Sequence, residues 1–510
     1  MRDPAPWQRK YELMAVCSLG FGLISQYLFI GNALGLSVLL FAAMFYGLFF
    51  YAVKGRIGGF DQWRGQSKSG WLLLLPIALL AVSYVLFHNE LFRSLNMIVL
   101  PALVAAQTVL LSRSSAKPWY RVAFYQDVIY LALIKPVSYF TVPFGLVTNR
   151  LAPKRDGEEG KARNGKLRRI ALGLLLAAPP LIVVIVLLAS ADRIFLDLVV
   201  RLPELFGGLS VGTLLGRVLL AGIITLYAFC YLWTLLFRKS GDGWKEYLKE
   251  VSATSGVMPS AVKLDPLTAV TLLMSFNFVY IIFAAIQFSY LFGAANGLLP
   301  AGAAYADYAR QGFAQLVIVS LINLALLLGG LHGIRTSGKA AETGRKLSLS
   351  MLVGCTLVML ISAFSRLSLY ESAYGYTQTR ILVHGFMIFL GVILIVSFIR
   401  IWRDHFSLAK AYIGLAVAAY VVMNYVNVDA IIAEQNMHRY EAHGEIDLDY
   451  LGSLSSDAYP AIKEMAALAP GLQPGTDEIL SKMQAAAQNR GGWPSWNLSV
   501  SRVLNSMDDR

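Results

Sequence analysis

Apolar runs of about 20 residues recur along the whole chain and are separated by short polar segments. A helix needs roughly 20 apolar residues to cross about 30 Å of hydrocarbon, and backbone groups in lipid must find their hydrogen-bond partners within their own segment. The pattern therefore predicts membrane-spanning helices rather than strands. Eleven spans are expected, at residues 12–30, 33–53, 70–87, 91–111, 170–190, 213–237, 267–292, 311–331, 347–367, 381–402 and 408–428.

The stretch 122–149 is apolar enough to cross, yet it differs from these spans. It contains Gln126, Asp127 and Lys135 and is broken by two prolines. Both of its flanks are strongly basic, and a single crossing would put them on opposite sides of the membrane. We therefore expect an interfacial or re-entrant segment here.

Composition agrees with the apolar runs and refines the meaning of the charge. Of the 510 residues, 56% are hydrophobic and 15% charged, whereas soluble proteins have about 25% charged residues. The net charge of +13 is uneven, because the chain from Asp429 onward holds 12 Asp and Glu against six Lys and Arg. The basic groups before Asp429 lie mostly in short loops, which favours a role in membrane orientation over nucleic-acid binding.

Loop charges also predict the orientation. With the N-terminus inside, the inner loops and the N-terminal segment hold 30 of the 38 Lys and Arg that precede Asp429. Lys and Arg in short loops favour the cytoplasmic side. We predict a multi-pass protein of the cell (cytoplasmic) membrane, with a cytoplasmic N-terminus and an extracytoplasmic C-terminus.

The predicted fold is all-α, a polytopic transmembrane helical bundle with a small helical tail. The transmembrane domain covers 1–428 and includes a basic cytoplasmic loop at 150–169 and an outer amphipathic helix at 191–209. The acidic extracytoplasmic tail covers 429–510. Its first helix is expected to continue the last span as far as Gly444. Apolar residues are sparse in the tail, so we expect it to pack on the membrane domain.

Five segments occur in a specific order: SADRIFLDL, YADYARQGF, SRLSLYESAYGYTQTR, VNVDAIIAEQN and IDLDYLGSLSSDAYPAI. They resemble the bacterial membrane-protein family called domain of unknown function 4153, or 4173 in its narrower form. The resemblance covers 170–463, and the first 170 residues resemble the family only in hydropathy. It implies an uncharacterized bacterial polytopic protein and assigns no catalytic residue.

Polar and aromatic residues gather at the level that the charge count places outside. An arginine at the centre of a span costs roughly 2.5–3.5 kcal/mol on insertion scales. Arg366, nearer the outer end, still needs a partner, and Glu371 and Asp429 are candidates. Snorkelling and aromatic-belt roles are one explanation; the other is a site for a small anionic or hydroxylated ligand. The candidate ligand-binding residues are Asp192, Arg193, Tyr305, Tyr308, Arg310, Arg366, Tyr370, Glu371, Tyr374, Tyr376, Arg380, His384, Asn424, Asn427 and Asp429.

Other chemistry has little support in the sequence. The three cysteines lie far apart inside apolar runs, so neither a disulfide nor a metal site is expected. Asp447 and Asp449 have the spacing of a glycosyltransferase metal motif, but aspartate at a helix start is a common cap. No nucleotide fingerprint or nucleophile signature occurs, and we expect no cofactor. Asn277 and Asn323 are predicted to make helix–helix hydrogen bonds; a substrate path is the alternative.

The function that follows is binding of a ligand or an envelope protein partner at the extracytoplasmic face, as a sensor or accessory component. The alternative is a transporter for a small polar or anionic solute. A second alternative is a membrane-embedded transferase that acts on an outer-leaflet substrate, so enzymatic activity stays open. The partners expected are the lipid bilayer and the outer-face ligand or protein, without nucleic acid.

Overall fold

The computed structural model describes residues 6–53, 67–150, 211–237, 265–293, 313–332, 338–403 and 406–508. Within these ranges every regular element is a helix. The first part of the chain forms α1 (Pro6–Phe29), α2 (Leu36–Val53), α3 (Ser67–Leu72), α4 (Leu74–Leu86), α5 (Glu90–Leu111), α6 (Val122–Ile129), the π-helix η2 (Tyr130–Ile134), the 3₁₀-helix η3 (Lys135–Tyr139), α7 (Val142–Arg150) and α10 (Val211–Leu236).

The remaining helices follow in the same sequence order as the predicted spans and tail. They are α12 (Pro266–Gly293), α14 (Phe313–His332), α15 (Lys339–Tyr374), α16 (Gln378–Trp402), α17 (Leu408–Tyr425), α18 (Val428–His443), α19 (Leu448–Gly452), η6 (Ser456–Ala458), α20 (Tyr459–Leu468), η7 (Pro470–Leu472), α21 (Gln473–Gln488), η8 (Trp493–Ser495) and α22 (Leu498–Asp508).

Ten helices in the described part of the chain are long and apolar enough to cross a membrane. They coincide with ten of the eleven predicted spans, and α3 and α4 together form one of these ten. The all-α polytopic fold predicted from hydropathy is therefore confirmed. The predicted span 170–190, the loop 151–169 and the amphipathic helix 191–209 lie outside the described residues.

The chain divides into two compact units. Unit 1 contains Met1–Lys239 and Ala486–Arg510, and unit 2 contains Ser240–Ala485. The core of unit 1 joins side chains of α1, α2, α5 and α10, among them Met14, Phe49, Val109 and Leu232. Because the surrounding lipid is as apolar as these side chains, close packing and interhelical hydrogen bonds hold such helices together.

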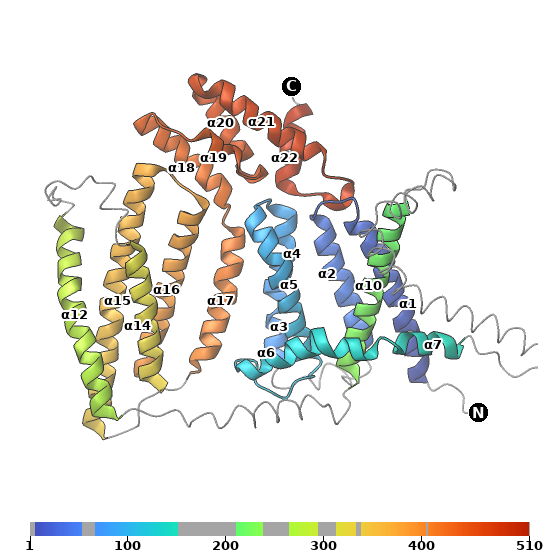
Figure 1. Cartoon of the computed structure of the whole chain (residues 1–510), viewed down its shortest axis with the longest axis horizontal. Coiled ribbons are helices and arrows are strands. Elements are labelled where there is room, and N and C mark those ends of the chain that lie inside the picture. The colour runs from blue at the N-terminus through green and yellow to red at the C-terminus, as the bar shows by residue number, and fades with distance from the viewer. Residues whose placement is uncertain are drawn as a thin grey trace, which may run out of the picture. The chain divides into compact units, whose positions relative to one another are not determined.

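In unit 1 the segment from α6 to α7 runs across the bundle rather than along it (Figure 1). Its backbone passes from α-helix through a π-helix and a 3₁₀-helix before α7 begins. Phe124, Val128 and Tyr139 face the core of unit 1. The interfacial or re-entrant position of 122–149 stays a prediction.

In unit 2, α12 and α14 pack along the long helix α15 (Figure 1). Asn277 of α12 donates its amide to the Ser348 carbonyl at 2.8 Å, and Asn323 of α14 donates to Thr356 Oγ1 at 2.9 Å. Both asparagines are fully buried. These contacts confirm the prediction that Asn277 and Asn323 make helix–helix hydrogen bonds.

The expected continuous helix from the last span into the tail is wrong. The helix α17 ends at Tyr425, and α18 begins at Val428 with Asn427 as its N-cap. The Asn427 side chain accepts from the Ala430 N–H at 3.3 Å, which satisfies one of the free donors of a helix start. Gly444 ends α18 in the left-handed conformation, as its position in the sequence indicates.

Candidate functional site

The centre of the candidate site is the turn that joins α15 to α16. Gly375 follows α15 with a φ of +83°, and its N–H donates to the Glu371 carbonyl at 2.8 Å. A Cβ at this position would lie 2.7 Å from Asn436 Oδ1. Glycine is therefore needed here for both the backbone conformation and the close approach of the tail.

Asn436 of α18 binds this turn through its backbone. Its Oδ1 accepts from the Tyr376 N–H at 2.9 Å, and its Nδ2 donates to the Tyr376 carbonyl at 2.9 Å. Nδ2 also donates to the Ile432 carbonyl of its own helix. A single buried amide thus occupies both backbone groups of Tyr376, and these groups would otherwise be costly to bury. Burial also raises the pKa of the Tyr376 phenol, and the Glu371 carboxylate adds to this rise.

Arg439, one turn further along α18, caps the end of α15. Its Nε donates to the Ser372 carbonyl at 3.2 Å, and its Nη2 donates to the Ala373 carbonyl at 2.7 Å. Carbonyls in the last turn of a helix have no partner within the helix and carry its negative dipole end. Arg439 also contacts Glu445, at 3.3 Å from Nη2 to Oε2. The guanidinium therefore links two segments of the tail to α15.

Tyr450 of α19 completes the attachment by contacting the start of α16. Its hydroxyl accepts the Gln378 N–H at 2.8 Å. Burial raises the pKa of the Tyr450 phenol, the bond from Gln378 lowers it, and Asp429 and Arg380 act through their charges. Both charged residues thus lie close enough to affect this phenol electrostatically.

On the hairpin itself, Arg380 and two tyrosines form a stack. The Arg380 guanidinium lies 4.4 Å from the centre of the Tyr370 ring, and the Tyr370 and Tyr374 ring centres are 4.8 Å apart. Arg380 Nη1 also donates to the Tyr374 and Gly375 carbonyls. Tyr374 remains 50% exposed. The stack is therefore a fixed aromatic surface with one open face.

Beside this stack, three polar side chains lie in a row between α15 and α16. His384 Nδ1 is 3.2 Å from Glu371 Oε1, and His384 Nε2 is 3.2 Å from Ser368 Oγ. The imidazole packs edge-on against the Phe364 ring at 4.3 Å. Glu371 is only 3% exposed, and its Oε1 has no well-aligned hydrogen bond to the described residues. A buried carboxylate oxygen is thus left as an acceptor.

The polar residues at the start of α18 have local structural roles. Asp429 is buried, and its Oδ2 accepts from the backbone N–H and the hydroxyl of Ser455. Asn424 donates to the Tyr420 carbonyl of its own helix at 2.9 Å. These contacts attach the segment around Ser455 to α18 and give no sign of a ligand.

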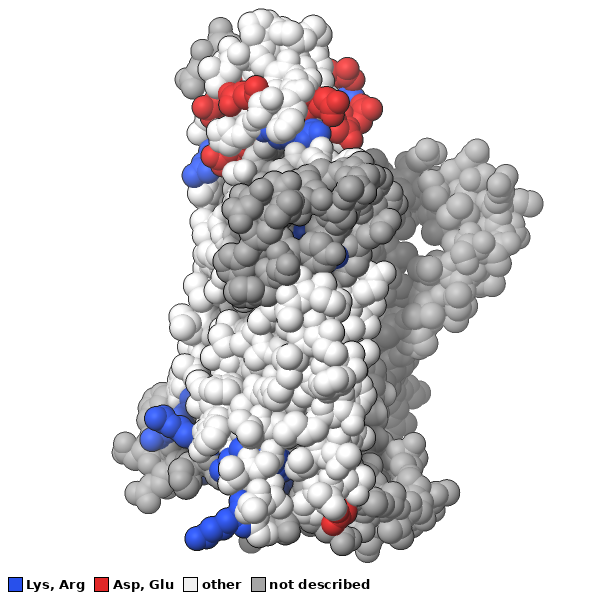
Figure 2. Space-filling view, turned by 90° about the vertical axis from the view of Figure 1, so that its left-hand side faces the viewer, with Lys and Arg blue, Asp and Glu red and all other residues white. Residues whose placement is uncertain are grey.

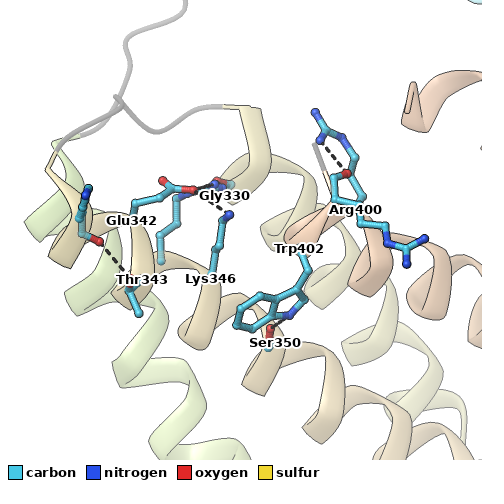
Figure 3. Close-up of polar contacts among 10 residues, drawn as sticks. Gly330, Glu342, Thr343, Lys346, Ser350, Arg400 and Trp402 are labelled. Atoms are coloured by element: carbon cyan, nitrogen blue, oxygen red, sulfur yellow. Dashed lines mark hydrogen bonds and ion pairs between the residues drawn. The ribbon is translucent and has the colours of Figure 1, made fainter. Parts of the chain in front are cut away.

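The opposite end of the α15–α16 hairpin contains basic residues with mainly local contacts (Figure 3). Glu342 accepts from Arg345 and lies 3.8 Å from Lys346 Nζ, both on the same helix. The Trp402 indole donates to Ser350 Oγ at 3.1 Å. On the face that Figure 2 shows, Asp and Glu gather mainly at the tail end, Lys and Arg occur at both ends, and an uncharged surface separates the two ends.

The last part of the tail has a separate attachment, within unit 1. The Leu36 N–H donates to the Trp496 carbonyl at 3.0 Å, and the Gly492 N–H donates to Asn32 Oδ1 at 2.9 Å. These bonds bring the C-terminal segment against the turn between α1 and α2.

Asn497 extends this attachment to the turn between α4 and α5. Its Nδ2 donates to the Tyr84 and Phe87 carbonyls, each at 2.9 Å, while its Oδ1 accepts from the Val500 N–H at 3.1 Å. His88 lies in the same turn, where burial lowers its pKa to about 3 and the charges of Arg490 and Arg93 contribute to this shift. This turn therefore contains a neutral imidazole beside two guanidinium groups.

The structure brings some predicted site residues together and leaves others apart. Tyr370, Glu371, Tyr374, Tyr376, Arg380 and His384 all belong to the α15–α16 hairpin. Asn424, Asn427 and Asp429 form a second group at the α17–α18 junction. Arg366 is half-buried on α15, and its pairing with Glu371 or Asp429 stays a prediction. Asp192, Arg193, Tyr305, Tyr308 and Arg310 lie outside the described residues.

Three tail residues that hold the turn were missed by sequence reasoning: Asn436, Arg439 and Tyr450. Asn436 closes the motif VNVDAIIAEQN, and Tyr450 lies in IDLDYLGSLSSDAYPAI. The signal was therefore present in the same motifs. It was missed because Asn436 and Tyr450 act on backbone groups of distant residues, which charge and hydropathy do not reveal.

These helices and their polar contacts define a multi-pass, all-α membrane protein with a helical tail bound to its hairpin. A family model described as domain of unknown function (DUF4153) matches residues 74–465. The chain belongs to this family. The match begins well before residue 170, so the expectation that the first 170 residues share only hydropathy is wrong for residues 74–169. No curated protein and no solved structure matches the chain.

Proposed function

We propose that the protein binds a hydroxylated ligand at its extracytoplasmic face, at the end of α15 and α16 where the tail attaches. The observation that carries the proposal is the Glu371 carboxylate, which is buried, adjoins His384 and keeps an acceptor oxygen without a well-aligned hydrogen bond among the described residues. Buried polar groups normally find partners. A ligand hydroxyl bound at Ser368 and His384 would connect to this carboxylate.

The neighbouring aromatic stack supplies a contact surface of the kind found at binding sites. Tyrosine and arginine are enriched among residues that dominate binding energy, and Tyr374 has an open face beside Tyr370 and Arg380. Because Arg380 already binds two backbone carbonyls, the support for an anionic ligand is weaker than for a neutral hydroxylated one. The tail holds the turn from the other side, which keeps the surface preorganised.

The placement on the outer side rests on the charge distribution. In unit 2, Asp and Glu gather mainly at the tail end of the hairpin (Figure 2). The opposite end holds Lys339, Arg345 and Lys346 at the start of α15 and Arg400 and Arg403 at the end of α16, and basic loops favour the cytoplasm. The side is testable with Tyr374→Cys and Trp402→Cys in a background where the exposed Cys17 is serine. A membrane-impermeant maleimide should label position 374 in intact cells and position 402 only after lysis. The reverse pattern would remove the proposal.

Photocrosslinking in intact cells tests the binding itself. A benzophenone amino acid replaces Tyr374 in one variant and Trp402 in the other; the two side chains are 50% and 54% exposed and lie at opposite ends of the hairpin. We expect a discrete adduct other than phospholipid at position 374, absent at position 402 and lost when Glu371→Gln is added. Phospholipid adducts alone at both positions would contradict ligand binding.

An enzymatic function is the second candidate, because Ser368, His384 and Glu371 follow one another in the order nucleophile, base and carboxylate. In acyl transfer the Ser368 oxygen would attack an ester carbonyl while its proton passes to His384 Nε2. The ester C–O bond then breaks, His384 returns the proton to the departing alcohol, and the acyl group stays on Ser368. A fluorophosphonate probe should then label Ser368, and Ser368→Ala should abolish labelling while Ser372→Ala preserves it. Absence of labelling in the wild type would exclude this candidate.

A transport function has less support than ligand binding or enzymatic activity. Asn277 and Asn323, the polar residues nearest the middle of the spans, donate to α15 and are fully buried. Neither side chain lines an open path between the described helices.

A further inference from the structure

The segment from α6 to η3 is apolar on two opposite faces. One face, with Phe124, Val128 and Leu131, packs into the core of unit 1. The other face presents Val122 and Leu133, which are 76% and 63% exposed. Ile129, Ile134 and Val137 are further exposed apolar side chains on the segment, and Phe140 is exposed just after it. An apolar row of this length would be unfavourable in water, so its outward face requires an apolar environment.

Contacts with α10 give the depth of this segment. Tyr139 donates its hydroxyl to the Phe237 carbonyl, just beyond the end of α10, and the Cys230 thiol donates to the Tyr139 carbonyl at 3.5 Å. Cys230 precedes Phe237 by about two helical turns, roughly 10 Å along the helix. Interfacial helices bury their apolar face to about 5–10 Å. The outward row therefore lies at the boundary between headgroups and acyl chains.

Basic residues surround the start of the segment. Arg121 precedes α6 and is exposed, and Lys68 is exposed at the start of α3. Both flank the same end of α5, because Gly70 of α3 packs against Leu111 and α6 contacts α5. The one acidic group described on the segment, Asp127, is already occupied, by Lys117 at 2.9 Å and Ser115 at 2.7 Å. The charge facing the headgroups is therefore positive.

Aromatic residues mark the same level. Trp119 and Tyr120 come just before α6, and Tyr125 of α6 is exposed. Tryptophan and tyrosine favour the membrane–water boundary. The segment thus presents an apolar row, then aromatic residues, then basic residues. Acyl chains, glycerol region and headgroup follow one another in the same order in a lipid.

We infer that α6–η3 and the adjoining loop bind an anionic phospholipid. The acyl chains lie along Val122, Ile129 and Leu133, and the phosphate headgroup lies between Lys68 and Arg121. The crosswise segment in Figure 1 is then a lipid-binding element rather than a cover for the bundle. This inference does not depend on the ligand site proposed for unit 2.

The test is titration of the full-length, delipidated protein with phosphatidylglycerol or phosphatidylcholine, followed by native mass spectrometry. Each basic residue near a membrane surface contributes about a factor of five in affinity for anionic lipid. The double variant Lys68→Gln with Arg121→Gln should therefore bind phosphatidylglycerol about 30-fold more weakly, with phosphatidylcholine binding unchanged. The control, Arg400→Gln with Arg403→Gln, removes two basic residues at the end of α16 and should leave both affinities unchanged.

Equal losses in the two double variants, or equal losses for both lipids, would overturn the site. Depth is measured independently with Ile129→Trp in nanodiscs that contain brominated lipid. Measured as the difference from the wild type with its nine native tryptophans, the added indole should be quenched by the bromine atoms and not by aqueous iodide. Iodide quenching would place the row in water and contradict the inference, whatever the lipid titrations show.

Discussion

The tail is attached at two places by different chemistry. In unit 2, side chains of α18 and α19 bind the backbone of the turn around Gly375, with Asn436 and Arg439 as the main donors. In unit 1, the C-terminal segment pairs its own backbone with the α1–α2 turn and places Asn497 on the α4–α5 turn. The first attachment uses a guanidinium on a helix end; the second lies beside a buried neutral imidazole.

This difference indicates how each attachment responds to conditions. Arginine stays charged at all accessible pH values, so the bonds from Arg439 to the Ser372 and Ala373 carbonyls are insensitive to acid. Burial, with the charges of Arg490 and Arg93, keeps His88 neutral at pH values well below its ordinary pKa of 6.5. Acid should therefore weaken the attachment in unit 1 and spare the one in unit 2, and each attachment can be broken separately.

The largest effect is expected for Gly375→Ala. The φ of +83° and the approach of Asn436 Oδ1 to 2.7 Å from the new Cβ leave no room for a side chain. Such strain costs about 3 kcal/mol, so proteolysis through local opening of the turn should accelerate about 100-fold. The matched control is Gly471→Ala, where an added Cβ meets nothing within 4 Å. Equal cleavage of both variants would show that the turn does not limit opening.

Asn436→Ala and Asn497→Ala are each expected to cost about 2 kcal/mol, because buried backbone groups lose their partners. Hydrogen exchange should increase at 375–378 in the first variant and at 84–88 in the second. Gln435→Ala, the neighbour of Asn436 on α18, is the control. If either variant loosened both attachments equally, the tail would have to be treated as one cooperative element.

Acid sensitivity distinguishes the attachments next. The pKa of His88 is about 3 in the fold and about 6.5 in an unfolded chain. Above pH 6.5 the imidazole is neutral in both the folded and the unfolded chain. As the pH falls towards 3, the unfolded chain binds a proton that the folded chain does not, so folding stability is lost. Between pH 6.5 and 3, the stability of unit 1 should therefore fall as the pH is lowered. His88→Gln should remove this dependence in thermal unfolding; an unchanged slope in the variant would assign it to other groups.

The smallest effect is expected for Tyr450→Phe. Loss of the hydroxyl leaves the Gln378 N–H without its 2.8 Å acceptor and should cost about 1 kcal/mol. Because burial raises the pKa of Tyr450, the phenol is neutral below about pH 10, so the size of this loss should not depend on pH in that range. Hydrogen exchange at Gln378 measures this loss, and identical exchange in wild type and variant would show that the bond is not formed.

Much of the fold followed from the sequence because hydropathy acts locally. The ten long apolar helices match predicted spans, because each apolar run only has to be long enough to cross the hydrocarbon core of the bilayer. The site was predicted in part for the same reason. The i, i+4 spacing placed Arg380 and His384 on one face of α16, and both do contact α15.

Tertiary structure decided which groups meet. Asn436 binds Tyr376 across 60 residues and Asn497 binds Tyr84 across 413 residues, and no periodicity in either segment specifies such a partner. The break between α17 and α18 also depended on Asn427 acting as a cap, where hydropathy alone favoured one continuous helix. The length of each apolar helix follows from its own residues, because the helix has to match the thickness of the lipid bilayer. Buried polar groups instead need partners from distant parts of the chain, which only the folded structure brings near.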